Sequence, residues 1–276
     1  MRVGIFLLLF CFSIVSETYR RTEIDKIQSE ILKAFEKTDV VIWGEEHNDR
    51  QGHSLQLEIL RYVSEKQDIA LSLEMLETDQ QTLVDEYWSG KISESSFLQA
   101  LRSWTNYKED YHPLVKFAKE KKIPVVCANA PKRYVSLVSS QGFVAITTLS
   151  PEALQFLPPL YLWKSGNNPK YEQKIKDVMT THVPKNFENF LLAQNLWDAT
   201  MAHSILQAKT RYSRKVFHIN GRFHSDDGLG VTSRIRLLGE GVYVISVFPE
   251  NAEEEKTRNE KAQLVILTDS KKDGRD

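Results

Sequence analysis

The sequence predicts an α/β fold, with a mainly parallel sheet and helices on both of its faces. Short apolar runs rich in β-branched residues alternate with segments of helical periodicity along most of the 276 residues, which is the pattern of strand–helix–strand units. Glycine or a polar residue ends most of these runs, as at Gly44 and Gly221. The composition, 41% hydrophobic and 26% charged, is that of a globular protein. A chain of this length builds a sufficient core without disulfides or a structural metal.

The N-terminus has the features of an export signal. Arg2 precedes an apolar stretch over residues 3–15, which is long enough for a signal sequence and too short for a membrane-spanning helix. We therefore expect a signal segment over residues 1–16, cleaved after Ser16, and a protein exported to the periplasm or anchored in the cell envelope. Lipidation at Cys11 is a weaker alternative, because Phe10 stands where lipoproteins usually have a small residue. A buried N-terminal helix or strand is the alternative without a targeting role.

Helical and strand patterns then follow one another along the chain. Ile24, Ile27 and Ile31 recur at helical spacing, so a helix precedes the first strand. Pro113 suits the first turn of a later helix. The predicted strands span residues 39–43, 69–73, 123–128, 215–220, 241–248 and 263–267. The predicted helices span residues 24–35, 53–66, 79–88, 93–104, 113–121 and 186–209.

One segment interrupts this alternation. Residues 145–185 contain five prolines and the sequence Gly-Asn-Asn, so we expect loops and short helices that form an insertion or lid. The segment is part of a single predicted domain over residues 17–269. The charged tail, residues 270–276, is predicted to be disordered. Cys127 would be the one cysteine left after export, so no internal disulfide is expected.

Polar residues follow four of the predicted strands at the point where each strand ends. They are Glu45, Glu46 and His47 after the first strand, Glu74 after the second, Asn129 after the third, and Arg222 and His224, with Phe223 between them, after the fourth. The carboxyl ends of parallel strands meet at one edge of the sheet, where α/β proteins bind their ligands. Two of the four ends share the pattern Gly-x-x-His, in which the glycine permits a sharp turn. We therefore expect these side chains to form one site.

Four of these residues carry the chemistry. Glu45, His47, Glu74 and His224 suit a divalent metal, a general acid–base pair, or both. Taken singly, each has an ordinary structural explanation, such as a glutamate near a helix N-terminus or a hydrogen-bonded loop histidine. Together, on three strand ends, they favour a functional site. The formal net charge of −1 gives no general attraction to nucleic acid, and the sequence has neither a phosphate-binding glycine loop nor a nucleophile elbow.

Several motifs resemble those of a known family. The run Val-Ile-Trp-Gly-Glu-Glu-His-Asn-Asp over residues 41–49, with His53 downstream, is similar to the opening motif of the ChaN family, part of the Tiki/TraB/erythromycin-esterase superfamily. Further similar motifs, in the same order, are Leu73-Glu74-Met75, Trp104 with Tyr111-His112-Pro113-Leu114, Ala128-Asn129-Ala130-Pro131, Trp197-Asp198, and Gly221-Arg222-Phe223-His224 with Arg234. The resemblance covers about residues 38–248. Residues 150–185, expected at the pocket entrance, match only loosely.

The resemblance implies haem binding and a part in haem or iron uptake. Haem iron takes an axial Tyr or His beside an apolar slot, and the candidates here are Tyr111, His53, His112 and His182. No C-x-x-C-H motif occurs, so covalent attachment is excluded. The implied partners are haem itself, the outer-membrane haem-uptake machinery and a second copy of the chain in a homodimer.

Two alternatives stay open. Because relatives in the wider superfamily are peptidases or esterases, the resemblance also implies a metal-dependent hydrolase. Glu45, Glu74 and His224 would then hold a metal or orient water, and His47 would be the general base or a further ligand. The third hypothesis is a structural role with a vestigial site. The sequence leaves open whether the protein is an enzyme.

Overall fold

An all-parallel sheet of six strands forms the centre of the fold. The computed structural model describes residues 12–164, 168–179, 186–250, 257 and 260–269. Within them the strands are β1 (Val40–Glu45), β2 (Ile69–Glu77), β3 (Val125–Asn129), β4 (Lys215–Gly221), β5 (Tyr243–Pro249) and β6 (Leu264–Thr268). They lie in the order β3-β2-β4-β1-β5-β6, and every pairing is parallel. The predicted fold class is confirmed.

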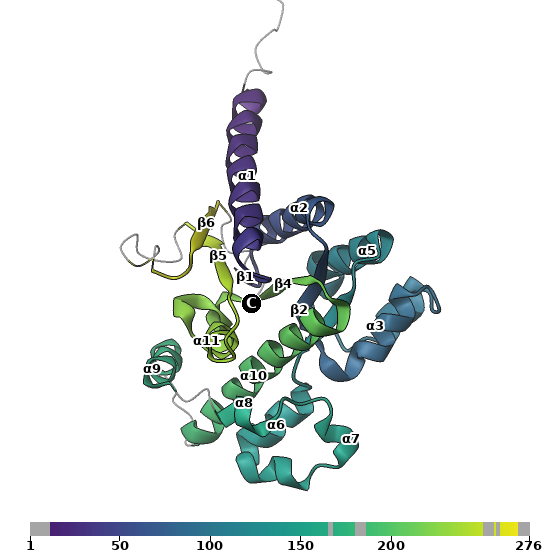
Figure 1. Ribbon diagram of the computed structural model, residues 1–276, viewed down its shortest axis with the longest axis vertical. Coiled ribbons are helices and arrows are strands. Elements are labelled where there is room, and N and C mark those ends of the chain that lie inside the picture. The colour runs from purple at the N-terminus through teal and green to yellow at the C-terminus, as the bar shows by residue number, and fades with distance from the viewer. Residues whose placement is uncertain (1–11, 165–167, 180–185, 251–256, 258–259, 270–276) are drawn as a thin grey trace, which may run out of the picture.

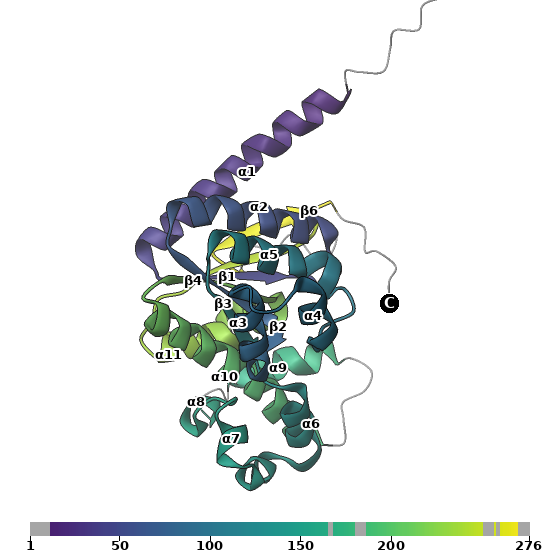
Figure 2. The same ribbon diagram turned by 90° about the vertical axis from the view of Figure 1, so that its right-hand side faces the viewer.

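Helices connect the strands and cover both faces of the sheet (Figures 1 and 2). They are α1 (Phe12–Lys37), α2 (Arg50–Lys66), α3 (Gln81–Trp88), α4 (Glu94–Ala100), α5 (His112–Lys121), α6 (Lys132–Gln141), α7 (Pro151–Leu154), α8 (Leu160–Lys164), α9 (Pro169–Val178), α10 (Phe187–Tyr212) and α11 (Gly230–Leu237). Side-chain oxygens of Asp49, Ser93 and Asn168 accept backbone N–H groups in the first turns of α2, α4 and α9. These caps fix where the three helices begin.

The strands are apolar on both sides because the sheet separates two layers of helices. Val41 and Trp43 of β1 pack into the larger core cluster, together with side chains of α1, α2 and α5. Val40 and Ile42, the alternate residues of the same strand, pack with side chains of α10 and α11. Neither face of β1 is left to water, which explains why its sequence is a continuous apolar run.

The predicted elements occur with shifted ends and with two omissions. The helix predicted over residues 93–104 ends at Ala100, and a π-helical turn, Tyr107–Tyr111, follows. The third strand begins at Val125 because the preceding proline has no N–H for the ladder. Periodicity does not reveal α6, which buries only Val135 and Val138, or α11, which is eight residues long and whose buried residues include Thr232 and Arg234. The Pro-rich segment contains the short helices α7, α8 and α9, and its function as a lid stays a prediction.

The predictions for the two termini fall largely outside the described residues. Residues 1–11, which include Cys11, and residues 270–276 are not among those described. α1 begins at Phe12, continues through Ser16, and projects from the rest of the fold at its N-terminal end (Figures 1 and 2). Of the helices in the described ranges, none combines the length and apolar character needed to cross a membrane. Export and cleavage after Ser16 stay predictions.

Candidate functional site

The polar strand ends meet at one edge of the sheet. Glu45 of β1 lies opposite Gly221 of β4 in the parallel register, so the two Gly-x-x-His turns leave the sheet as neighbours. β2 continues past Glu74, and its register with β3 shifts between Leu73 and Glu77. Bulges of this kind re-aim side chains and are common beside functional sites. The convergence expected from the strand ends is therefore present.

Glu45 is a buried carboxylate that contacts four polar side chains. Nδ1 of His47 lies 3.0 Å from its Oε1, and the Tyr111 hydroxyl donates a hydrogen bond to the same oxygen. The Gln56 amide donates to Oε2, and Nδ1 of His53 lies 3.4 Å from that oxygen. Only 3% of Glu45 is exposed, so these contacts replace the hydration that the carboxylate loses on burial. They also fix its orientation.

His47 is the histidine of the site that reaches solvent. Its side chain is 41% exposed, and its ring packs edge-on against Trp104, with the ring centroids 4.8 Å apart. Because Nδ1 faces Glu45, Nε2 is the nitrogen left without a hydrogen-bond partner among the described residues. The ring also lies against Gly221, where an added Cβ would come within 2.7 Å of both Nε2 and Cε1. Glycine at the end of β4 thus provides the space that His47 occupies.

His224, the second histidine, belongs to a buried chain of ion pairs. Its Nδ1 lies 2.7 Å from Oδ1 of Asp198, and its Nε2 lies 3.6 Å from Oε1 of Glu74. Oδ2 of Asp198 lies 3.5 Å from Nη1 of Arg234, and Oε2 of Glu74 accepts the Gly221 N–H at 2.6 Å. Burial disfavours protonation of His224, but Glu74 and Asp198 outweigh it and raise its pKa. These ion pairs and hydrogen bonds connect α10 and α11 to the ends of β2 and β4.

The contacts of Glu45 shift pKa values in opposite directions. Burial opposes ionisation of Glu45, but hydrogen bonds from His47 and His53 outweigh it and lower the pKa of Glu45 to about 2. Burial also disfavours charge on His53, yet its hydrogen bond to Glu45 raises the pKa of His53 to about 9. The pKa of His47 is raised for the same reason, against the effect of its burial. Glu45 is therefore ionised at neutral pH, and both rings gain affinity for a proton.

The residues predicted to carry the chemistry come together, but they pair with protein groups. Glu45 and Glu74 each contact a histidine, and His47 and His224 each contact a carboxylate. In the described ranges, no group of three or more His, Cys, Asp or Glu side chains is arranged to hold a metal ion. The predicted divalent-metal site is therefore not supported. Asn129 accepts the neighbouring Ala130 N–H at 2.9 Å and so stabilises its own turn.

The predicted haem ligands are placed differently from His47. Tyr111 is fully buried, with its hydroxyl hydrogen-bonded inside the site. His53 and His112 are each 5% exposed. None of these three lines the clefts that border His47, so in this conformation none offers a donor atom there. His182 lies outside the described residues.

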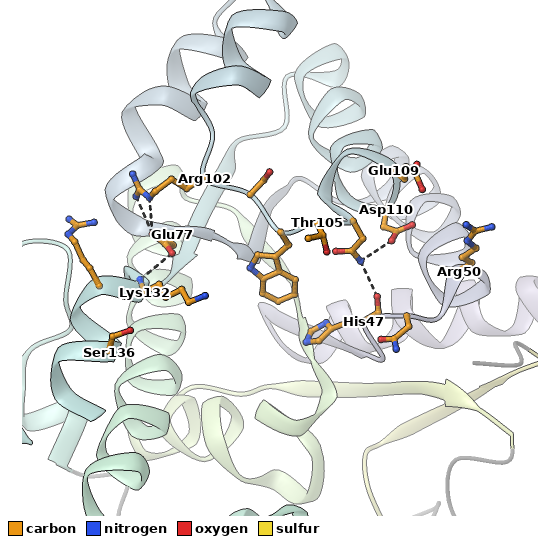
Figure 3. Close-up of a pocket in the computed structure, with 14 residues that line it drawn as sticks. His47, Arg50, Glu77, Arg102, Thr105, Glu109, Asp110, Lys132 and Ser136 are labelled. Atoms are coloured by element: carbon orange, nitrogen blue, oxygen red, sulfur yellow. Dashed lines mark hydrogen bonds and ion pairs between the residues drawn. The ribbon is translucent and has the colours of Figure 1, made fainter. Parts of the chain in front are cut away.

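Two clefts open beside His47, which lines both of them. The larger has a volume of about 1140 Å³, and its lining includes Trp104 and Arg133. Figure 3 shows Arg102 and Lys132, which also line it. The smaller, about 780 Å³, lies between the Arg222 turn and α9. His47 therefore stands at the junction of two openings on the ligand-binding edge of the sheet.

Sequence reasoning does not identify several residues of this site. The resemblance includes Asp198 in a motif but gives it no role in the site. Asp198 is fully buried on α10, and an acidic residue within the apolar stripe of a long helix is the signal that could have revealed that role. Gln56 lies on the buried face of α2, where a polar side chain gives a similar signal. Arg102 and Arg133 carry no comparable signal, because exposed cations are common in any surface loop or helix.

A family model supports the resemblance seen in the sequence. The model described as haem-binding uptake, Tiki superfamily, ChaN matches residues 31–235. This range is more than half of the chain and includes β1 to β4 with the residues of the site described above. No curated protein matches the chain.

Solved structures show a related fold. ChaN of Campylobacter jejuni, solved for its cofacial haem binding, is 17% identical and has a TM-score of 0.63, with 88% of this chain and 91% of that chain covered. A MARTX toxin effector domain from Vibrio vulnificus is 14% identical, with a TM-score of 0.49 and with 88% of this chain and 39% of that chain covered. An erythromycin esterase in its open conformation is 11% identical, with a TM-score of 0.44 and with 76% of this chain and 70% of that chain covered.

Proposed function

This chain belongs to the ChaN family of haem-binding uptake proteins in the Tiki superfamily, and we propose that it binds haem in the larger cleft beside His47. The observation that carries the proposal is a 41% exposed imidazole in a cleft of about 1140 Å³ at the carboxyl edge of the parallel sheet. The cleft is slightly larger than the roughly 300–1,000 Å³ typical of small-molecule sites, and this edge is where such folds bind ligands.

Among the residues that line the cleft, most of which are polar, His47 and Trp104 suit haem. His47 would hold the iron through Nε2, because Glu45 engages Nδ1 in the way that carboxylates orient metal-binding histidines. Trp104 lies beside it and offers an aromatic surface. Haem would supply the iron, and His47 would supply the nitrogen that binds it. Because the contact with Glu45 raises the pKa of His47, this ring would bind iron more strongly as the pH rises through that pKa.

A haemin titration followed in the Soret region tests the proposal. The wild-type protein is expected to show saturable binding with a ligand-type spectrum. His47→Ala should weaken binding by about tenfold or more, which corresponds to about 1.4 kcal/mol or more, and should shift the Soret band. His203→Ala is the matched control, because His203 is half-buried on α10 and lines neither cleft.

The same titration separates His47 from the tyrosine predicted as ligand. Tyr111→Phe removes only a hydroxyl that donates to Glu45, so the Soret spectrum should be retained. A spectrum lost in Tyr111→Phe and kept in His47→Ala would contradict the assignment of His47. Weak, non-saturating binding by the wild-type protein would contradict haem binding itself.

We further propose that the protein is exported and takes part in haem or iron uptake. Arg2 with the apolar residues 3–15 supports export, and the family description supports uptake. Cell fractionation with mass spectrometry of the mature N-terminus tests cleavage after Ser16 against lipidation at Cys11, and an intact cytosolic chain would contradict export. Delivery to outer-membrane uptake machinery and homodimerisation are parts of the same proposal. Sedimentation with and without haemin tests the dimer.

A further inference from the structure

The larger cleft has two walls of opposite character, with His47 between them. Arg102, Lys132 and Glu77 lie on one side, and Glu109 and Asp110 lie on the other (Figure 3). The first wall comes from the loop after α4, the end of β2 and the start of α6. The second comes from the π-helical turn before α5. A ligand in the cleft therefore meets a different charge on each side.

The first wall is a preorganised pair of guanidinium groups. Asp79, whose side chain is 8% exposed, places one carboxylate oxygen on Arg102 and the other on Arg133. Glu77 accepts from Nε and Nη2 of Arg102 at 3.4 and 3.1 Å. The Arg133 guanidinium also lies over the Tyr134 ring, 4.3 Å from its centroid. Both arginines are thus held in place before any ligand arrives, which reduces the entropy lost on binding.

This wall has more positive than negative charge. Among the described residues, two carboxylates, Glu77 and Asp79, pair with this wall, which carries the three cations Arg102, Lys132 and Arg133. The Lys132 ammonium forms no ion pair among the described residues, since Glu77 contacts its backbone N–H instead. The side chains of Arg102 and Arg133 are 56% and 47% exposed, so both still present N–H groups to the cleft. A purely structural ion-pair network would leave less unpaired positive charge.

The opposite wall is unfavourable to an anion. Glu109 and Asp110 both line the cleft there, together with one cation, Arg50. The Asn106 amide donates to Asp110 at 2.9 Å and to the His47 carbonyl oxygen at 3.0 Å, which holds Asp110 close to His47. Carboxylates of a ligand would be repelled by Glu109 and Asp110, and this repulsion disfavours the orientation that places them together.

We propose that Arg102, Lys132 and Arg133 bind the carboxylate groups of the ligand, so that the cleft selects carboxylate-bearing porphyrins and orients them away from Glu109 and Asp110. This inference rests on the proposed haem binding and specifies which porphyrins the cleft selects. Iron ligation and carboxylate binding then involve different parts of the cleft. Arginine and carboxylate pair through charge-assisted, often bidentate, hydrogen bonds, which suits recognition of a carboxylate in a fixed position.

Three probes separate the two contributions in the full protein. Haemin has iron and free carboxylates, haemin dimethyl ester has iron without free carboxylates, and protoporphyrin IX has carboxylates without iron. Quenching of tryptophan fluorescence gives a dissociation constant for each. We expect the wild-type protein to bind the dimethyl ester about tenfold more weakly than haemin, and to bind protoporphyrin IX with an affinity that His47→Ala does not change.

Matched variants locate the effect in the wall. Lys132→Gln removes a cation without breaking an ion pair to any described residue, and Arg102→Gln with Arg133→Gln removes the guanidinium pair. Each should weaken haemin binding about fivefold to thirtyfold and leave binding of the dimethyl ester unchanged. Arg50→Gln is the control, because it removes the same charge from the opposite wall of the same cleft. Thermal unfolding of each variant checks that it is folded.

The outcomes distinguish the inference from the proposed function. No saturable binding of haemin would contradict the proposed function. If haemin and its dimethyl ester bind equally and Lys132→Gln behaves like Arg50→Gln, the wall does not bind carboxylates, while haem binding stands. If Lys132→Gln weakens binding of haemin but not of the dimethyl ester, the result supports carboxylate binding by this wall.

Discussion

The imidazole of His47 lies directly against the backbone of Gly221, and a Cβ at position 221 would come within 2.7 Å of its Nε2. The contact joins the two Gly-x-x-His turns, which follow neighbouring parallel strands. Gly221 has a φ of −58°, which any residue can adopt. Space for the ring, and not backbone conformation, is thus what requires glycine at this position.

Gly221→Ala is expected to weaken haemin binding by about tenfold, because the methyl group displaces the His47 ring. The measurement is the haemin dissociation constant, with circular dichroism to check the fold. A double-mutant cycle is the control. If alanine acts through His47, the pair Gly221→Ala and His47→Ala binds no more weakly than His47→Ala alone. Additive losses would contradict the mechanism.

Glu45→Gln is expected to lower the free energy of unfolding by about 3 kcal/mol, because three hydrogen-bond donors and the nearby His53 ring lose an ionised, buried partner. Urea denaturation measures the change. Glu46→Gln is the adjacent control, since the Glu46 side chain is 40% exposed and its ion pair with Arg222 should contribute under about 1 kcal/mol. If the free energy of unfolding falls equally in the two variants, the burial of Glu45 does not increase its contribution to stability.

Stability should depend on pH through the contact of Glu45 and His53. The raised pKa of His53, about 9 against 6.5, gives a contribution that is complete below pH 6.5 and is lost as the pH rises to about 9. The lowered pKa of Glu45, about 2 against 4.5, gives a contribution that is complete above pH 4.5 and is lost as the pH falls to about 2. This pair should therefore stabilise most between pH 4.5 and 6.5.

The alkaline part of that profile has a direct control. In the wild-type protein the free energy of unfolding should fall by about 1–3 kcal/mol between pH 6.5 and 9. His53→Gln cannot be protonated, so the decrease should be smaller in this variant. The test is a series of urea denaturation curves at fixed ionic strength. The same decrease in both proteins would assign the effect to other groups.

Asp198→Asn is expected to destabilise the fold by about 3–5 kcal/mol, because it leaves the fully buried Arg234 guanidinium without its carboxylate. The pKa of His224 should fall as well, since Asp198 raises it. Thermal unfolding and an NMR titration of the histidines measure the two effects. Asp177→Asn, an exposed position on α9, should change stability by under about 0.5 kcal/mol. A stable Asp198→Asn protein with an unchanged His224 would contradict the role of this ion pair.

Much of the fold could be predicted because its signals are local. A buried strand of a parallel sheet is a short apolar run, and β1 and β4 occur within two residues of their predicted ends. α11 was harder to predict because its eight residues contain few helical repeats and its buried face includes Thr232 and Arg234. The helix predicted through residue 104 ends early, at Ala100, since periodicity does not register the cap that ends it.

The candidate site was predicted in part, for a similar reason. Parallel strands all end at the same edge of the sheet, where ligands bind. Glu45, His47, Glu74 and His224 could therefore be grouped from their positions at strand ends alone. Their pairing could not be predicted. Asp198 reaches His224 only because α10 packs against β2, β3 and β4, and nothing near Asp198 in the sequence encodes that packing.

The sequence by itself determined the parallel sheet, the edge at which ligands bind and the four acid and histidine residues gathered there, because apolar periodicity and chain order are enough to define them. Only the tertiary structure decided that Tyr111 and His53 are buried partners of Glu45, that His47 is the exposed ring, and that Arg102 and Arg133 share Asp79. Exposure and ion pairing depend on which distant segments pack together, and that information is absent from any local stretch of the chain.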